Sequence, residues 1–128
     1  MAKDLLNTGA AWLEEQRHQH LTRTVMYERG ADSVELAATV GRTEFEQADE
    51  YGVVRRTESR DFLVRTQDLV IGGALALPKS GDRVRETTGA TAYVYEVMAP
   101  GGEPPFRYSD PKRLTLRIHT KHVATESE

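Results

Sequence analysis

The chain contains no cysteine among its 128 residues. Disulfides, thiolate metal ligands and a cysteine nucleophile are therefore excluded, which agrees with a reducing cytoplasm. The longest uncharged stretch, Leu69 to Pro78, is shorter than the roughly 20 apolar residues that a membrane-spanning helix needs. The amino terminus has no basic head followed by an apolar core, so neither a membrane span nor a secretory signal is expected.

A strong excess of positive charge is also missing. The formal net charge is -3 and the pI is about 5.8, which argues against a dedicated duplex-DNA binder, because such proteins neutralise many phosphates with clustered lysine and arginine. The length of 128 residues fits a single domain with one core.

What the sequence does contain is alternation of apolar and polar residues with a period of two. In the clearest stretch, Leu114, Leu116 and Ile118 share one face while polar residues occupy the other, as on a half-buried β-strand. Similar patterns predict a hairpin that ends at Gly41 and a final strand from Leu114 to Val123. Further strands are predicted at residues 61–65, 83–87 and 93–97.

These patterns predict a mainly β fold: a small antiparallel β-barrel or sandwich with a short amino-terminal helix and a long loop between early strands. A single domain is expected over residues 1–128. It divides into a helical segment at 1–22, the barrel at 23–123 and a polar tail at 124–128.

The long loop is predicted at about residues 43–59, where five acidic residues stand against two bases, Arg55 and Arg56. Loops of this length are uncommon in compact domains unless they have a function. We therefore predict a surface excursion that contacts other molecules.

No catalytic or metal-binding motif is recognisable. The chain has no Gly-x-Ser-x-Gly elbow, and Gly72-Gly73 lacks the remainder of a phosphate-binding loop. His119 lies on the predicted polar face beside Arg117 and Lys121, which favours a solvated strand edge. We expect no enzyme activity and no cofactor, and an enzyme would require a pocket that joins His119 or His122 to a carboxylate.

The basic residues admit two interpretations. Arg83, Arg85, Arg117 and Lys121 are predicted on outward strand faces, with Tyr93, Tyr95 and Tyr108 nearby, as in barrels that bind single-stranded nucleic acids. The favoured interpretation is that the tyrosines belong to the core and the bases protect strand edges. Trp12 similarly either completes packing within the chain, which is favoured, or inserts into another subunit.

The order of these features resembles the head-closure proteins of tailed bacteriophages, also called stoppers or head-tail joining proteins. The resemblance covers most of the chain and depends on modest motifs: Arg60-Asp61-Phe62-Leu63-Val64, Leu77-Pro78-Lys79-Ser80-Gly81-Asp82-Arg83-Val84, Tyr95-Glu96-Val97 and Arg117-Ile118-His119-Thr120. It implies a structural virion protein of the phage neck, made in the host cytoplasm, that forms a ring, closes the portal channel and links head to tail.

The resemblance also implies partners: copies of the chain itself, the portal or adaptor protein, the tail terminator protein and packaged DNA near the channel. Residues expected in the channel or subunit-contact loop are Glu44, Phe45, Glu46, Asp49, Glu50, Tyr51, Arg55 and Arg56. Candidate partner contacts are Trp12, Arg83, Arg85, Arg117 and Lys121. Two alternatives stay open: another ring-forming tail component such as a tail terminator, and a single-strand nucleic-acid-binding barrel.

Overall fold

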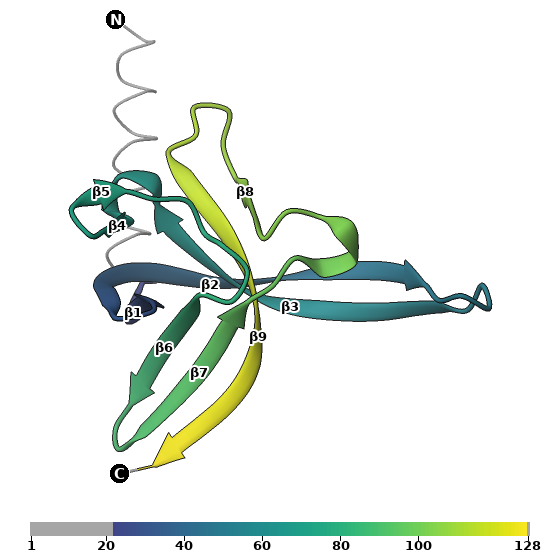
Figure 1. Cartoon of the computed structure of the whole chain (residues 1–128), viewed down its shortest axis with the longest axis horizontal. Coiled ribbons are helices and arrows are strands. Elements are labelled where there is room, and N and C mark those ends of the chain that lie inside the picture. The colour runs from purple at the N-terminus through teal and green to yellow at the C-terminus, as the bar shows by residue number, and fades with distance from the viewer. Residues whose placement is uncertain (1–21, 128) are drawn as a thin grey trace, which may run out of the picture.

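The computed structural model describes residues 22–127, which form an antiparallel β structure (Figure 1). The amino-terminal helix predicted for residues 1–22, and Trp12 within it, fall outside this range except for Thr22. The strands are β1 (Arg23–Arg29), β2 (Asp32–Ala48), β3 (Val54–Arg65), β4 (Val70–Ile71), β5 (Ala74–Leu75), β6 (Arg83–Thr88), β7 (Thr91–Val97), β8 (Phe106–Tyr108) and β9 (Thr115–Ser127). Two short 3-10 turns are η1 (Thr66–Asp68) and η2 (Pro100–Gly102).

Six of the strands pair in a closed circuit. The ladder runs from β1 through β2 and β3 to β9, and returns through β7 and β6 to β1. All of these pairs are antiparallel, and β8 pairs with β9 on the side away from β3. Because the circuit closes, the inward faces of all six strands meet in one core.

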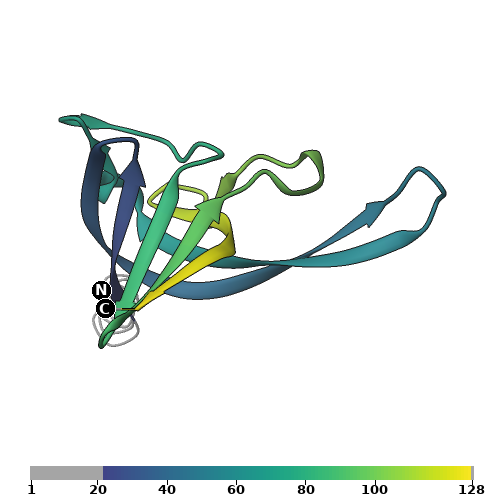
Figure 2. The same cartoon turned by 60° about the horizontal axis from the view of Figure 1, so that its bottom comes forward.

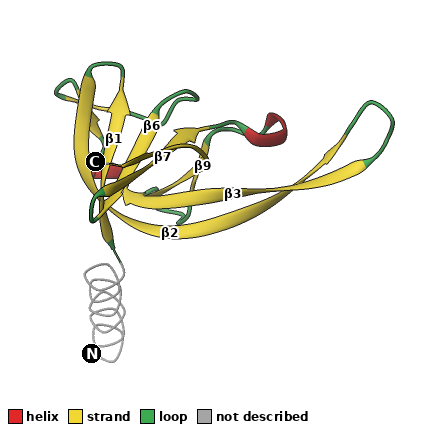
Figure 3. Cartoon of the chain, turned by 90° about the horizontal axis from the view of Figure 1, so that it is seen from below, coloured by secondary structure: helices red, strands yellow, loops and turns green. Residues whose placement is uncertain are grey.

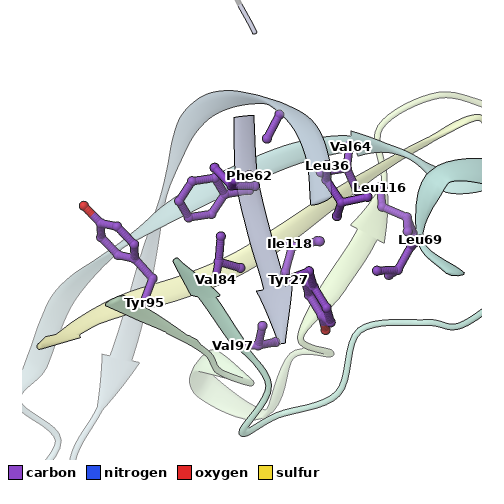
Figure 4. Close-up of a cluster of buried hydrophobic side chains, with 12 residues drawn as sticks. Tyr27, Leu36, Phe62, Val64, Leu69, Val84, Tyr95, Val97, Leu116 and Ile118 are labelled. Atoms are coloured by element: carbon purple, nitrogen blue, oxygen red, sulfur yellow. The ribbon is translucent and has the colours of Figure 1, made fainter. Parts of the chain in front are cut away.

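Alternation along the strands places the apolar side chains in that core. Phe62 and Tyr95 lie at one end of it, with ring centroids 5.4 Å apart, and Leu69 after η1 covers another part (Figure 4). Period-two patterns correctly predicted core-facing positions in β1, β2, β7 and β9. Two residues expected on these faces are exposed and were predicted wrongly: Tyr93, with an exposed fraction of 37%, and Leu114, with 62%. The buried apolar side chains of this core are Val25, Tyr27, Leu36, Ala38, Phe62, Val64, Leu69, Val84, Tyr95, Val97, Leu116 and Ile118.

The prediction of an irregular loop at residues 43–59 is wrong. β2 continues through Gly41 to Ala48 and pairs with β3 in regular register from Ala38↔Val64 to Ala48↔Val54. Gly41 does not end the strand. A Cβ atom there would lie 3.2 Å from Arg117 Nη1, so the glycine makes room for a guanidinium that crosses it.

The predicted polar tail at residues 124–128 is also strand as far as Ser127. Ala124, Thr125, Glu126 and Ser127 pair with β7, after a register shift opposite Val94 and Tyr95. This segment is polar because both of its faces contact solvent. It is nevertheless hydrogen-bonded to β7 as a strand. In contrast, residues 98–105 between β7 and β8 form no strand and contain η2.

The motif Pro78-Lys79-Ser80-Gly81-Asp82 is the turn that leads from β5 into β6 and contacts β1. Gly81 has φ +96°, a conformation that other residues rarely adopt. The turn places the buried Asp82 carboxylate against β1, where it accepts hydrogen bonds from the Tyr27 hydroxyl and from Arg29 Nη2 at 2.8 Å. Burial acts to raise the pKa of Asp82, but the hydrogen bonds from Arg29 and Tyr27 leave it below its ordinary value.

We predict that Phe62→Ala lowers the free energy of unfolding by about 3–5 kcal/mol, because it removes a fully buried ring from a closed core. Urea denaturation followed by circular dichroism measures this. The matched control is Val53→Ala at an exposed position, which should change stability by less than about 0.5 kcal/mol. Equal losses in the two variants would contradict the assignment of the core.

Candidate functional site: the projecting hairpin and its root

The outer half of the β2–β3 hairpin projects from the body as a two-stranded ribbon (Figures 1 and 2). β1 pairs with β2 only as far as Ala38, and β9 pairs with β3 only from Arg60 onward. At about 3.3 Å per residue, the ladder from Gly41 to Ala48 therefore extends roughly 23 Å. In the described part of the chain, both outer edges of this ribbon have no neighbouring strand.

The tip of the ribbon is an ordered turn that presents apolar side chains. The Asp49 carboxylate accepts hydrogen bonds from the backbone N–H groups of Tyr51 and Val53, both at 2.9 Å. The side chains that follow point into solvent, with exposed fractions of 84% for Tyr51, 54% for Val53 and 60% for Val54. Three adjacent exposed apolar side chains at the end of a polar arm are typical of a protein contact.

Charge is unevenly distributed along the hairpin. Residues 43–53, in β2 and the turn, carry four acids and no base. The β3 side carries Arg55 and Arg56 together with Glu58, and Arg42 lies on β2 near the root. Arg56 Nε is 3.5 Å from Glu46 Oε1, and Arg42 Nη1 is 3.8 Å from Glu58 Oε1. These pairs are exposed and each contributes little to stability, so the charges remain available to other molecules.

A buried carboxylate holds the root of the hairpin. Asp61 is fully buried on the outer face of β3, opposite the core. Its carboxylate accepts four side-chain hydrogen bonds, from Thr43 of β2, Ser59 of β3, and Arg117 and His119 of β9. The distances are 2.5 Å to Ser59 Oγ, 2.7 Å to Arg117 Nη1 and 2.9 Å to His119 Nδ1. One side chain thus connects three strands.

The pKa of Asp61 reflects this environment. Burial raises the pKa of the carboxyl group, but the hydrogen bonds from His119, Ser59, Thr43 and Arg117 lower it by more. The net result is a pKa well below the ordinary value for aspartate. The carboxylate is therefore ionised at neutral pH, and its charge strengthens each of the four bonds.

His119 is not on a solvated edge, and that prediction is wrong. Its side chain is only 3% exposed, and its ring packs at right angles to the Phe45 ring with centroids 5.1 Å apart. The backbone N–H of His119 donates to Pro105 O at 2.9 Å, and the His119 carbonyl accepts from Met98 N. The segment around η2 therefore lies beside the strand and helps to bury the hairpin root.

Ser59, His119 and Asp61 form a Ser-His-Asp cluster, but its geometry does not suit nucleophilic catalysis. In a catalytic triad the serine and the aspartate contact opposite nitrogens of the imidazole. Here Ser59 Oγ lies 3.4 Å from the same Nδ1 that meets Asp61, and the serine hydroxyl donates directly to the carboxylate. All three side chains are buried, so a substrate has no access to the hydroxyl.

Two further features to consider in residues 22–127 are metal binding and membrane-spanning helices. No group of three or more histidine or acidic side chains there is arranged to hold a metal ion. In the same range, no helix is long and apolar enough to cross a membrane.

The predicted loop residues do come together on one arm, but as members of strands and a turn. Phe45 packs at the root against His119, while Glu44, Glu46 and Glu50 are exposed along the arm and at its tip.

The predicted partner contacts do not form one surface. Arg85 pairs with Glu28 and Glu126, Arg117 belongs to the root, and Arg83 and Lys121 are exposed on different strands.

The root itself was missed. Its members are separated by up to 76 positions in sequence, from Thr43 to His119, and only strand pairing brings them together. The available signal was a spacing of two residues, which places Ser59 and Asp61 on one strand face and Arg117 and His119 on another. A polar pair on each of two adjacent strands indicates a buried network only when their pairing is known.

A family model described as "Phage head-tail joining protein" matches residues 3–127, nearly the whole chain. The chain therefore belongs to this family, as the resemblance in its motifs had predicted. No curated protein matches it. The family membership supports a structural role in the phage neck, contacts with other head and tail proteins, and location in the virion.

We predict that Asp61→Asn lowers the free energy of unfolding at pH 7 by about 3 kcal/mol, because it leaves buried donors and the Arg117 charge without their anion. Because the folded pKa of Asp61 is lowered, its contribution is complete above the unfolded pKa of about 3.9. It is lost as the pH falls from there toward the folded pKa, so the difference between wild type and variant should shrink below about pH 4.

Urea denaturation at several pH values measures this difference. The matched control is Glu58→Gln, an exposed carboxylate on the same strand, which should change stability by less than about 0.5 kcal/mol. If the difference in the free energy of unfolding between wild type and Asp61→Asn stays constant from pH 7 to pH 3, the Asp61 carboxylate is not the ionised group that stabilises the root.

Proposed function

We propose that this chain is a head-closure protein: it forms a ring in the phage neck, and its hairpins close the channel below the portal. The observation that carries this proposal is the ordered ribbon that projects about 23 Å beyond the body, with apolar side chains at its tip. A channel plug requires an arm that reaches the axis and a tip that contacts other tips. A small barrel-like body built on the closed strand circuit would form the wall of the ring.

The charge of the arm suits a gate for DNA. The four acids of residues 43–53 repel phosphate, so that the arm blocks the duplex without binding it. Arg55 and Arg56 lie on β3, which is paired with the β2 segment that carries Glu44 and Glu46, and Arg56 contacts Glu46 of the same hairpin.

The division of charge also supports a ring. Heterologous contacts place different faces of identical subunits against each other, and they close into a ring if the rotation permits. The acidic β2 side of one hairpin is complementary to the β3 side of the next, which carries Arg55 and Arg56. The neighbours expected above and below this ring are the portal or adaptor protein and the tail terminator protein.

The two alternatives differ in their support. A single-strand nucleic-acid-binding barrel needs a free cationic and aromatic face, whereas Arg85 and Arg117 are engaged in ion pairs and Tyr95 is buried. A tail terminator would also form a ring, but its role would not depend on an arm that closes a channel. Removal of the arm therefore distinguishes the proposed function from a terminator.

We predict that a chain with a shortened hairpin folds but does not retain DNA. Phe45 and Thr57 are direct partners in the ladder, so the residues between them can be replaced by Asn-Gly, the preferred two-residue turn. Thr43, Ser59 and Phe45 are kept, so the root remains intact. Complementation of a phage that lacks the protein, followed by electron microscopy, should reveal heads without DNA.

A second comparison separates the charge of the arm from its length. Glu44→Gln with Glu50→Gln removes two exposed charges from the arm, and Glu35→Gln with Glu103→Gln removes two exposed charges from the body. We expect DNA retention to fall only for the arm variant. DNA-filled, tailed particles formed at wild-type yield by the shortened hairpin would overturn the proposed function.

A further inference from the structure

β3 and β9 form a fork where the β2–β3 hairpin diverges from the part of the sheet formed by β6, β7 and β9 (Figures 1 and 3). They pair from Arg65↔Thr115 to Arg60↔Thr120 and then separate. Beyond this point β3 follows β2 into the hairpin, and β9 follows β7 to Ser127. The edges of β3 at Val54–Ser59 and of β9 at Lys121–Ser127 border this fork, and in the described residues neither edge has a strand beside it.

A groove of about 610 Å³ lies at the vertex of the fork. It lies on the side of the sheet that continues from the core, and its lining includes Arg42, Glu58, Arg60, Tyr95, Lys121 and His122. The register shift of β9 opposite Val94 and Tyr95 occurs next to it. Such bulges bend a strand, which favours an open fork.

The floor of the groove is held in a fixed arrangement. The Arg60 guanidinium lies 5.0 Å from the centre of the Tyr95 ring and donates to Glu86 Oε2 at 2.9 Å. Arg23 Nη1 donates to the other oxygen of the same carboxylate at 2.7 Å. A ligand would therefore meet a surface that is already ordered, which reduces the entropy lost on binding.

The fork is positively charged in a chain whose net charge is -3. Six bases lie at the vertex or on the strands that border it, against four acids. Glu86 is shared by two of the bases, Glu46 contacts Arg56, and Glu126 contacts Arg85 of β6. The bases are Arg23, Arg42, Arg55, Arg56, Arg60 and Lys121, and the acids are Glu46, Glu58, Glu86 and Glu126.

From these observations we propose that the fork binds an extended, acid-rich segment of a partner protein, which adds as a strand to a free edge. Unpaired backbone N–H and C=O groups supply the hydrogen bonds of strand addition. The excess of bases selects acidic side chains, and like charges disfavour a basic segment. Because the fork includes Arg55 and Arg56, a bound segment and a neighbouring hairpin would compete for these bases. The proposal does not depend on whether the hairpin tip closes a channel.

The test uses the full chain and a fluorescein-labelled octapeptide of alternating valine and glutamate, with binding followed by fluorescence anisotropy. We expect saturable binding that weakens as salt is raised. A peptide of alternating proline and glutamate carries the same charge but lacks every second N–H donor. A peptide of alternating valine and lysine reverses the charge. Neither of these two peptides should bind.

Variants locate the site. Arg55→Glu with Lys121→Glu reverses two exposed charges on the two free edges and should weaken binding at least about tenfold. Lys79→Glu with Lys112→Glu makes the same charge change outside the fork and should leave the affinity unchanged. Thermal unfolding of each variant establishes that it is folded.

Several outcomes would overturn the proposal. Equal binding of the proline peptide would indicate attraction by charge alone, and equal weakening by both double variants would place the site elsewhere. Self-association that Arg55→Glu with Lys121→Glu abolishes would assign the fork to a second copy. Tighter binding of a labelled single-stranded oligonucleotide than of the acidic peptide, lost in the same variant, would assign it to nucleic acid.

Discussion

The architecture depends on one buried anion, the carboxylate of Asp61. Four side-chain donors from β2, β3 and β9 meet it at the point where the hairpin leaves the body. A two-stranded ribbon is only marginally stable by itself, so its direction must be set by contacts at its root. Asp61, together with Phe45 against His119, provides those contacts. The arm is thereby an extension of the body and not a separate flexible element.

Two further carboxylates act in the same way elsewhere in the circuit. Asp82 connects the turn before β6 to Tyr27 and Arg29 of β1, and Glu86 connects β6 to Arg23 and Arg60. Because the apolar core is small, it does not cover the ends of the six strands in the closed circuit. Each carboxylate joins strands that are distant in sequence at such an end, so charged pairs extend the order beyond the apolar side chains.

The sequence predicted those parts of the fold in which one face is apolar. Alternation at Val25 and Tyr27, and again at Leu116 and Ile118, correctly located strands of the core. The hairpin was missed because Phe45 is a single apolar residue among the polar residues 42–47 of β2, so a period of two has almost no hydrophobic signal there. The Asp61 root could not be derived, because its members meet only through the pairing of β3 with β9. The family, in contrast, was identified from short motifs and agrees with the match over residues 3–127.

The most direct test of this account is the distance between the hairpin tip and the body in solution. The chain has no cysteine, so spin labels can be placed at Val53→Cys and Lys112→Cys alone, and pulsed electron resonance gives their distance distribution. A rigid arm held by Asp61 predicts one narrow distribution that broadens when Asp61→Asn is added. A broad distribution in the chain with Asp61 intact would contradict the claim that the buried carboxylate sets the position of the arm.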